Sequence, residues 1–284
     1  MLNIITDVDG VLLDWFNGFE RWIVDVKGIK PLHDTTPSKY ALTDKYPLTS
    51  KEIVDYIAEF NSSEYFSQLK PVDGSIEFLS MLLLDKTKNI VWLSSGATEG
   101  KEEECFDMRA KNLKECFGVD MPGTLLPMSA KKDECLKKYK EEFGYDMVFI
   151  EDSLDHAKTA IKLGIKTILL GYSYNTTHYS SKLLYKAKNW SEIYSAVAKI
   201  EEEVEFMNTH VSRTGMTAKR WDYLKNLSVI NPKYVHVSAK ASMIKNPLDS
   251  ALPPIPMVTR PGTTYSIGKN KAKREKKLNR GAKV

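Results

Sequence analysis

The chain has 284 residues, 42% of them hydrophobic and 27% charged, with a formal net charge of +4. That size allows one substantial domain plus an insertion or a tail, and the composition is typical of a soluble globular protein. The longest apolar stretch, at residues 81–84, is far too short to span a bilayer, and the three cysteines lack the pairing of a disulfide framework or the spacing of a zinc site, so we expect a cytoplasmic protein without membrane contact.

The positive charge is concentrated at the end of the chain. In residues 268–284, eight basic residues stand against Glu275, which gives this segment about +7 and leaves about −3 for the rest. Such a segment has almost no apolar residues and is predicted to be disordered. It could make weak contacts with nucleic acid by releasing counterions, or it could simply be a solubilising tail.

The first predicted strand, at residues 2–6, runs directly into Asp7, Val8, Asp9 and Gly10. Because side chains alternate along a strand, Asp7 and Asp9 are expected to point the same way at its carboxyl end. Two neighbouring carboxylates repel each other, and a divalent cation relieves that repulsion. The alternative is a surface turn, since Asp-Gly is a common turn pair. The apolar residues on both sides argue against a surface turn.

The next predicted elements form a small helical insert at residues 14–69. Apolar and aromatic residues recur with helical spacing at residues 12–26 and again at residues 51–60. The stretch between them, residues 31–47, contains Pro37 and Pro47 and is predicted to be a loop.

Strands and helices alternate after the insert. The patterns predict helices at residues 75–84, 98–116, 131–143, 155–163 and 191–206, and strands at residues 89–93, 124–126, 146–150 and 165–170. Such alternation predicts a doubly wound α/β fold with a parallel sheet, here residues 1–13 plus 70–206. Ligands of such sheets bind at the carboxyl ends of the strands, where Asp7, Ser94 and Asp152 fall.

Residues 207–267 contain six prolines that interrupt any regular pattern. We therefore predict an irregular C-terminal extension ahead of the basic segment.

The motif from Asp7 to Leu12 resembles the first signature of the haloacid-dehalogenase-like (HAD) phosphohydrolases. Further motifs follow in the order of that family: Ser94 closes a strand, Lys131 and Lys132 begin a helix, and residues 148–155 end a strand in acidic residues. Taken singly, Ser94 could be a helix cap or turn serine.

The resemblance implies a role for each of these positions. Asp7 would be the nucleophile that forms an aspartyl-phosphate, and Asp9 would be the general acid and base. Phosphate would be bound by hydroxyl, backbone and ammonium groups, supplied by Ser94, Ser95 and either Lys131 or Lys132. Mg²⁺ would be held by the carboxylates of Asp7 and Asp152 and by the backbone carbonyl of Asp9.

The fourth motif departs from the commonest version of the family in two places. Glu151 stands where glycine is commoner, and Asp155 comes one position early, leaving His156 in its slot. Glu151 and Asp155 could assist metal binding. For Asp155, capping of the next helix is an equal alternative.

Residues 64–74 resemble the segment that returns from the insert to the core in 5′(3′)-deoxyribonucleotidase-like members. The insert is rich in aromatic residues, which could stack on a nucleobase or could form the insert's own core: Trp15, Phe16, Phe19, Trp22, Tyr40 and Tyr46. The expected substrate is a nucleoside monophosphate, with a small sugar phosphate as the alternative. Two other functions stay open: a polynucleotide-end phosphatase that uses the basic tail, and a non-catalytic HAD-like binding or assembly protein.

Overall fold

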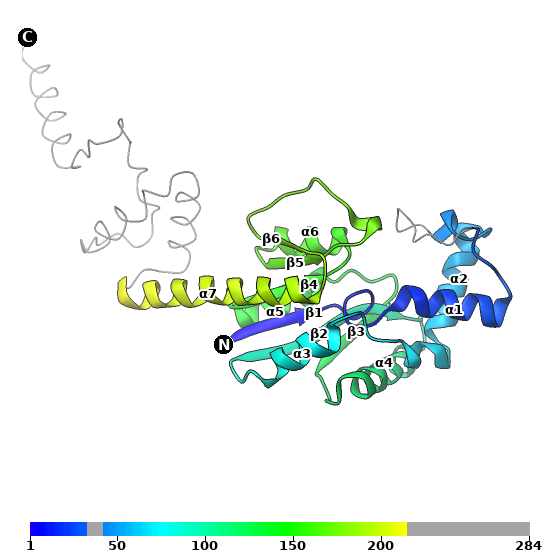
Figure 1. Ribbon diagram of the computed structural model, residues 1–284, viewed down its shortest axis with the longest axis horizontal. Helices are drawn as coiled ribbons and strands as arrows, with labels where there is room; N and C mark the ends of the chain where they lie inside the picture. Colours follow the sequence, from blue (N-terminus) through cyan, green and yellow to red (C-terminus); the bar gives the residue numbers. More distant parts are fainter. Residues whose placement is uncertain (33–41, 215–284) are drawn as a thin grey trace, which may run out of the picture. The chain divides into compact units, whose positions relative to one another are not determined.

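The protein is described by a computed structural model, which covers residues 1–32 and 42–214. Residues 1–209 form one compact unit. Its centre is a six-stranded sheet of order β3-β2-β1-β4-β5-β6, in which every neighbouring pair is parallel (Figure 1). The strands are β1 (Leu2–Thr6), β2 (Lys88–Ala97), β3 (Gly123–Pro127), β4 (Met147–Glu151), β5 (Lys166–Leu170) and β6 (Leu184–Ala187).

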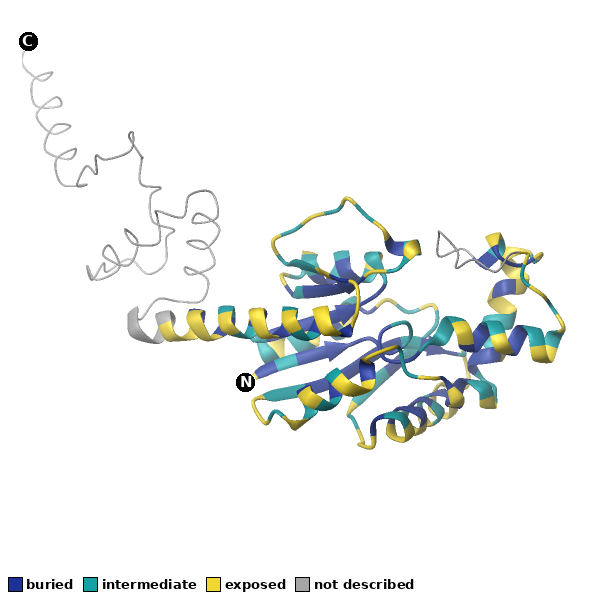
Figure 2. Ribbon diagram, viewed as in Figure 1, coloured by how far each residue is buried: buried dark blue, intermediate teal, exposed yellow. Residues whose placement is uncertain are grey.

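Helices cover both faces of this sheet, as in a doubly wound fold. The helices are α1 (Trp15–Lys27), α2 (Ser50–Asn61), α3 (Ser75–Leu84), α4 (Glu102–Phe117), α5 (Asp133–Phe143), α6 (Leu154–Lys162) and α7 (Trp190–Thr214). Ile4 of β1 packs in the cluster that contains α3, α4 and α7, whereas Ile5 packs with α5 and α6. The alternation of side chains along β1 therefore supplies both cores, and the buried strands run through the middle of Figure 2.

The segment at residues 14–69 contains α1, α2 and two short 3-10 helices, η1 (Leu42–Asp44) and η2 (Glu64–Gln68). The side chain of Asp14 caps α1, and Thr49 with Glu52 forms a capping box at the start of α2. Five of its aromatic residues pack on one another and are buried: Phe19, Trp22, Tyr46, Phe60 and Phe66. These rings form the core of the segment itself. Trp15 and Phe16 are only partly buried.

Several boundaries differ from the sequence prediction by a few residues, and three differences are larger. Strand β2 continues to Ala97, beyond Ser94, which we predicted to close it. A register shift between Ser95 and Ala97 makes Gly96 the extra residue of a β-bulge. Strand β6 was not predicted. Helix α7 continues to Thr214, so residues 207–214 are helical rather than irregular.

Other predictions fall outside the described residues. They concern Tyr40, the remainder of the C-terminal extension and the basic segment 268–284. Within the ranges that the structure describes, no helix is long and apolar enough to cross a membrane. The three cysteines are free thiols.

Candidate active site

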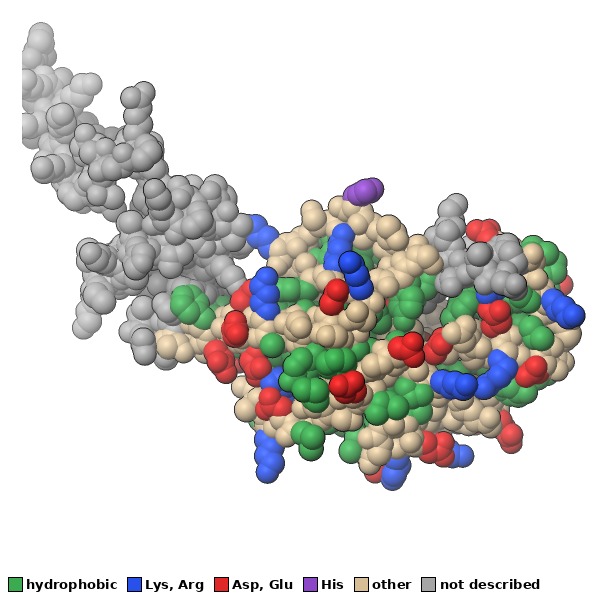
Figure 3. Space-filling view, viewed as in Figure 1, with side chains coloured by type: hydrophobic (Ala, Val, Ile, Leu, Met, Phe, Trp, Pro, Cys, Tyr) green, Lys and Arg blue, Asp and Glu red, His purple; other side chains and the backbone are tan. Residues whose placement is uncertain are grey.

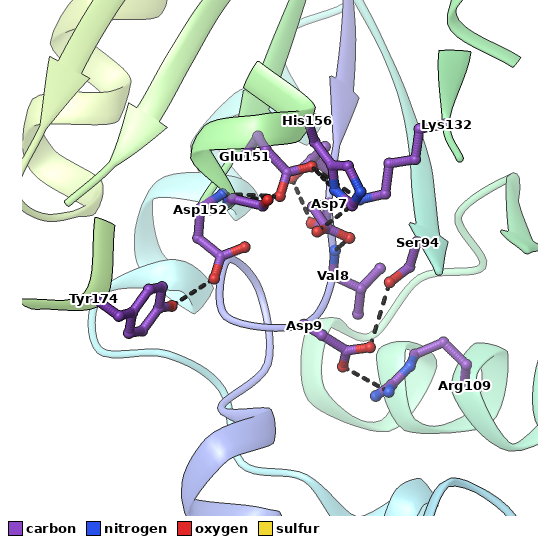
Figure 4. Close-up of polar contacts among 12 residues, drawn as sticks. Asp7, Val8, Asp9, Ser94, Arg109, Lys132, Glu151, Asp152, His156 and Tyr174 are labelled. Carbon is purple, nitrogen blue, oxygen red and sulfur yellow. Dashed lines mark hydrogen bonds and ion pairs between the residues drawn. The ribbon is translucent and has the colours of Figure 1, made fainter. Parts of the chain in front are cut away.

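Charged side chains gather at the carboxyl ends of β1, β2 and β4, the three central strands of the sheet (Figure 4). The strand order reverses around β1, because the chain passes first to β2 on one side and later to β4 on the other. Where the strand order reverses, the loops that follow the two neighbouring strands turn to opposite faces of the sheet. This leaves a crevice at the carboxyl ends of those strands. The predicted site residues of the first, second and fourth motifs are therefore brought to one place.

Asp7 lies directly after β1 and is almost fully buried. Its Oδ2 is 2.7 Å from the Nζ of Lys132, and its Oδ1 accepts a 2.7 Å hydrogen bond from the backbone N–H of Val8. Burial raises the pKa of Asp7 to about 7, and the nearby negative charge of Glu151 adds to the rise, while Lys132 opposes it. The carboxylate of Asp7 is therefore shielded from water, and its charged neighbours are Lys132 and Glu151.

Lys132 is the buried member of the predicted lysine pair. Its Nζ lies 2.9 Å from Oε2 of Glu151 as well as beside Asp7, and both carboxylates raise its pKa against the effect of burial. Lys131 is exposed. Of the two lysines that the sequence left open, Lys132 is therefore the one whose ammonium lies beside Asp7.

Glu151 is the last residue of β4 and is fully buried. Its Oε1 accepts hydrogen bonds from the backbone N–H groups of Asp152 and Ser153, at 3.1 and 2.9 Å. Although burial alone would raise its pKa, Lys132 and His156 hold the pKa below the usual range. Glu151 thus fixes the loop that follows β4 and shares Lys132 with Asp7.

Asp9 is held by a different cation. The Nη2 of Arg109, in α4, donates a 2.6 Å hydrogen bond to Oδ1 of Asp9, and the hydroxyl of Ser94 donates to Oδ2 at 3.3 Å. Burial raises the pKa of Asp9, and Arg109 partly offsets the rise. The strand ends at Thr6, so the strict alternation expected for the two aspartates does not extend to them, and their carboxylates meet different partners (Figure 4).

Asp152 follows β4 and faces the loop after β1. Its Oδ2 accepts a 2.5 Å hydrogen bond from the hydroxyl of Tyr174, and its backbone carbonyl accepts one from Asn175. Burial, together with the charges of Glu151 and Asp7, raises its pKa well above the usual range. Gly10 has a φ of +78°, and a Cβ there would lie 2.5 Å from Oδ2 of Asp152, so only glycine allows this approach.

Ser94 and Ser95 lie on the last part of β2, beside the bulge at Gly96. The hydroxyl of Ser94 is engaged with Asp9, whereas the buried hydroxyl of Ser95 has no hydrogen-bond partner among the described residues. Asn61, at the end of α2, donates from Nδ2 to the carbonyl of Gly96 at 2.8 Å, and its Oδ1 accepts from the indole N–H of Trp15 at 3.0 Å. This amide connects the bulge to the helical segment.

A cavity of about 460 Å³ opens between these strand ends and the helical segment. Its polar floor includes Asp9, Ser95 and Asp152, and its upper wall is largely apolar. The wall is formed chiefly by Trp15, Phe16, Leu42, Ile53, Val54 and Ile57. A ligand with a polar or charged end and an apolar body has the matching polarity.

The charges of the cluster do not balance. It contains four carboxylates, those of Asp7, Asp9, Glu151 and Asp152, and two cations, those of Arg109 and Lys132. The pKa values of three of them, Asp7, Asp9 and Asp152, are raised. Buried carboxylate oxygens whose charge is not neutralised are the donors that a hard divalent cation prefers. The residues present therefore fit a divalent metal.

A second acidic group includes a histidine. Ligand atoms of Asp7, Glu151 and His156 all lie within 4.8 Å of one another. However, the ammonium of Lys132 already contacts both carboxylates, and a cation there would face it directly. We therefore do not assign a metal to this group. Asp155 is exposed and pairs with Lys158 on the surface, so it lies outside the cluster.

Sequence reasoning missed three residues of the site. Arg109 stands four residues after Cys105 and four before Leu113, both buried, so its place in the apolar stripe of α4 was a usable signal. Asn61 and Tyr174 carry no such pattern, because their roles depend on contacts between distant segments.

Residues 1–201 match the family described as 5′ nucleotidase, deoxy (pyrimidine), cytosolic type C protein. The chain belongs to this family. The family match confirms the predicted resemblance to the nucleotidase-like members of the HAD phosphohydrolases, and the chain is a phosphatase. No protein with curated annotation matches the sequence.

Solved structures of HAD-like proteins are also similar. A haloacid-dehalogenase-like hydrolase from Streptococcus pneumoniae is 16% identical with a TM-score of 0.49, over 69% of this chain and 98% of its own. CbbY from Rhodobacter sphaeroides, in complex with phosphate, is 17% identical with a TM-score of 0.46, over 68% and 96%. A putative β-phosphoglucomutase from Thermotoga maritima is 16% identical with a TM-score of 0.43, over 70% and 99%.

Proposed function

We propose that this phosphatase hydrolyses a nucleoside monophosphate with Mg²⁺, through an aspartyl-phosphate on Asp7. The observation that carries the proposal is the pair of differently supported carboxylates at the end of β1: Asp7 beside Lys132, and Asp9 beside Arg109. A nucleophile and a separate acid and base are what a two-step phosphoryl transfer needs.

In the first step an oxygen of Asp7 attacks phosphorus while the bond from phosphorus to the ester oxygen breaks. Asp9 gives its proton to that oxygen, and the alcohol leaves. In the second step water attacks the aspartyl-phosphate and loses a proton to Asp9, which releases phosphate and restores Asp7. Lys132 and the free hydroxyl of Ser95 are suited to hold phosphate oxygens, because one is a buried cation and the other a buried, unpaired donor.

The residues proposed to hold Mg²⁺ are Asp7 and Asp152 through their carboxylates and Asp9 through its backbone carbonyl. Bound there, the cation would offset the excess of negative charge and help to neutralise the transferring phosphoryl group. The close approach of Gly10 to Asp152, which brings the loop after β1 against β4, supports this assignment.

The cavity supports a nucleoside as the leaving group. Trp15 stacks on Phe19 with ring centroids 5.1 Å apart, and its indole N–H is taken by Asn61, so the ring is fixed at the cavity wall. A fixed aromatic wall favours a planar base over a sugar alone.

A magnesium-dependent phosphatase screen across nucleoside monophosphates, sugar phosphates and 3′-phosphorylated oligonucleotides tests the proposal. We expect the highest kcat/KM on a nucleoside monophosphate, no activity in EDTA, and no turnover by Asp7→Asn. A preference for sugar phosphates would contradict the substrate assignment. Magnesium-dependent turnover by Asp7→Asn would contradict the nucleophile.

The polynucleotide-end alternative depends on residues 268–284, which lie outside the described part of the chain. On the face shown in Figure 3, basic and acidic side chains of the described residues are interspersed, which does not favour a nucleic-acid track there. A preference for 3′-phosphorylated oligonucleotides in the same screen would favour this alternative. A cytoplasmic location, proposed from the family description and the free cysteines, is tested by cell fractionation.

A further inference from the structure

Arg109 is a buried cation, and a contribution to the stability of the fold does not explain why it is buried. None of its side chain is exposed, and Asp9 is its ion-pair partner. Its Nε and Nη1 are buried and have no hydrogen-bond partner among the described residues. Burying a guanidinium costs free energy that a single ion pair repays only in part, and an apolar side chain of similar size would cost less.

The guanidinium is fixed by its surroundings. Its central carbon lies 3.8 Å from the ring centroid of Phe66, a buried residue of η2. One turn further along α4, the side chain of Asn112 pairs with both the N–H and the carbonyl of Leu69, at 3.1 and 3.0 Å. Helix α4 is thus joined to the segment around η2 at Arg109 and again one turn further on, which leaves the guanidinium little freedom.

This fixed cation in turn fixes Asp9. Arg109 holds Oδ1 of the carboxylate at 2.6 Å and Ser94 holds Oδ2 at 3.3 Å, so neither oxygen is free to rotate (Figure 4). The side chain of Asp9 is nevertheless 17% exposed, and the residue lines the cavity. The carboxylate is therefore presented to the cavity in one orientation.

We propose that Arg109 is a positioning residue that holds Asp9 for proton transfer to the leaving group. The inference rests on the proposed function. In that step the proton passes from Asp9 to the ester oxygen as the bond to phosphorus breaks and the bond from Asp7 forms. Arg109 acts through Asp9, with Phe66 as its support.

The test compares two substrates that differ in their need for the proton. Thymidine 5′-monophosphate releases an alcohol, which leaves only if it is protonated, whereas p-nitrophenyl phosphate releases a stable phenolate. The quantity measured is kcat/KM, because it reports on steps up to departure of the leaving group and excludes hydrolysis of the aspartyl-phosphate. The variants are Arg109→Met, Arg109→Lys and, as a control, Lys111→Met, which changes an exposed residue of the same helix.

For Arg109→Met we expect kcat/KM to fall about 100-fold on thymidine 5′-monophosphate and to stay within about threefold on p-nitrophenyl phosphate. Arg109→Lys should recover part of the ratio between the two substrates, and Lys111→Met should not alter it. An equal fall on both substrates would overturn the inference, since lost folding or lost phosphate binding affects both alike.

Circular dichroism and Tm measurements accompany each variant. If Arg109→Met does not fold, Phe66→Leu takes its place in the comparison, because it keeps the guanidinium and removes its aromatic support. We expect a smaller shift of the substrate ratio in the same direction, and an unchanged ratio would overturn the inference. If the wild type is active on both substrates and the ratio of the two kcat/KM values is unchanged in all variants, the role of Arg109 is refuted and the proposed function is not. A wild-type protein inactive on both would refute the proposed function itself.

Discussion

The replacement Asp7→Asn should stabilise the metal-free protein at alkaline pH while it removes activity. The pKa of Asp7 is raised from 3.8 to about 7 in the folded protein. Between these values the folded state binds more protons than the unfolded state, so Asp7 lowers the stability of the wild type as pH rises, until the loss is complete above the folded pKa.

The size of the effect follows from that interval. From pH 5 to pH 8 the protein crosses about two of the three pKa units, and at 1.36 kcal/mol per unit this gives about 3 kcal/mol. The amide of Asp7→Asn cannot pair with Lys132 as a carboxylate does, but this lost pairing lowers the stability of the variant by a similar amount at both pH values and leaves the pH-dependent difference unchanged. The variant should therefore gain stability relative to the wild type by up to this amount as pH rises from 5 to 8.

Urea unfolding at pH 5 and pH 8 in EDTA, followed by circular dichroism, measures the difference. Asp155→Asn is the matched control, since it removes an exposed carboxylate a few residues from the cluster and should give the same difference at both pH values. If the stability of Asp7→Asn relative to wild type does not increase with pH, the charge of Asp7 is not a cost to folding and the reasoning fails.

Three further predictions follow from the site. Asp9→Asn should lower kcat on a nucleoside monophosphate about 100-fold or more, and steady-state rates near those of the wild type would contradict its role. Gly10→Ala should weaken Mg²⁺ binding in calorimetry and cost about 1–3 kcal/mol, whereas Gly28→Ala, which has a similar φ but open space, should leave Mg²⁺ binding unchanged. Lys132→Met leaves two buried carboxylates without their cation and should cost about 3–5 kcal/mol in urea unfolding, whereas Lys131→Met should cost almost nothing.

The core was predictable because its patterns are local. The helix at residues 75–84 was predicted with the bounds that it has, since an apolar run lies between Gly74 and Asp85. By contrast, β6 has four residues with Lys186 in the middle, and its pairing with β5 holds it in the sheet. Strand β2 also outlasts its apolar run, because Ser94, Ser95 and Ala97 are kept in the sheet by pairing with β3.

Within the site, positions tied to a motif could be predicted and their partners could not. Asp7, Asp9 and Asp152 stand where strands end, and strand ends are visible in a sequence. The choice between Lys131 and Lys132 depends on which side chain turns inward at the start of α5, which adjacent identical residues do not reveal. Tyr174 lies in a short 3-10 turn after β5 and donates to Asp152, and no periodic sequence pattern around Tyr174 signals this contact.

The side-chain amide of Asn61 makes two structural hydrogen bonds, and this limits how freely the helical segment at residues 14–69 could be replaced by the corresponding segment of another protein. The same side chain holds the wall residue Trp15 and the carbonyl of Gly96 in the β2 bulge, while Thr98 donates to the carbonyl of Ala58 nearby. A segment transplanted from a relative would have to supply an equivalent amide, or the bulge beside Ser94 and Ser95 would lose the hydrogen bond that ties it to the helical segment. Specificity in this protein is therefore easier to redesign residue by residue on the wall than by grafting a whole helical segment.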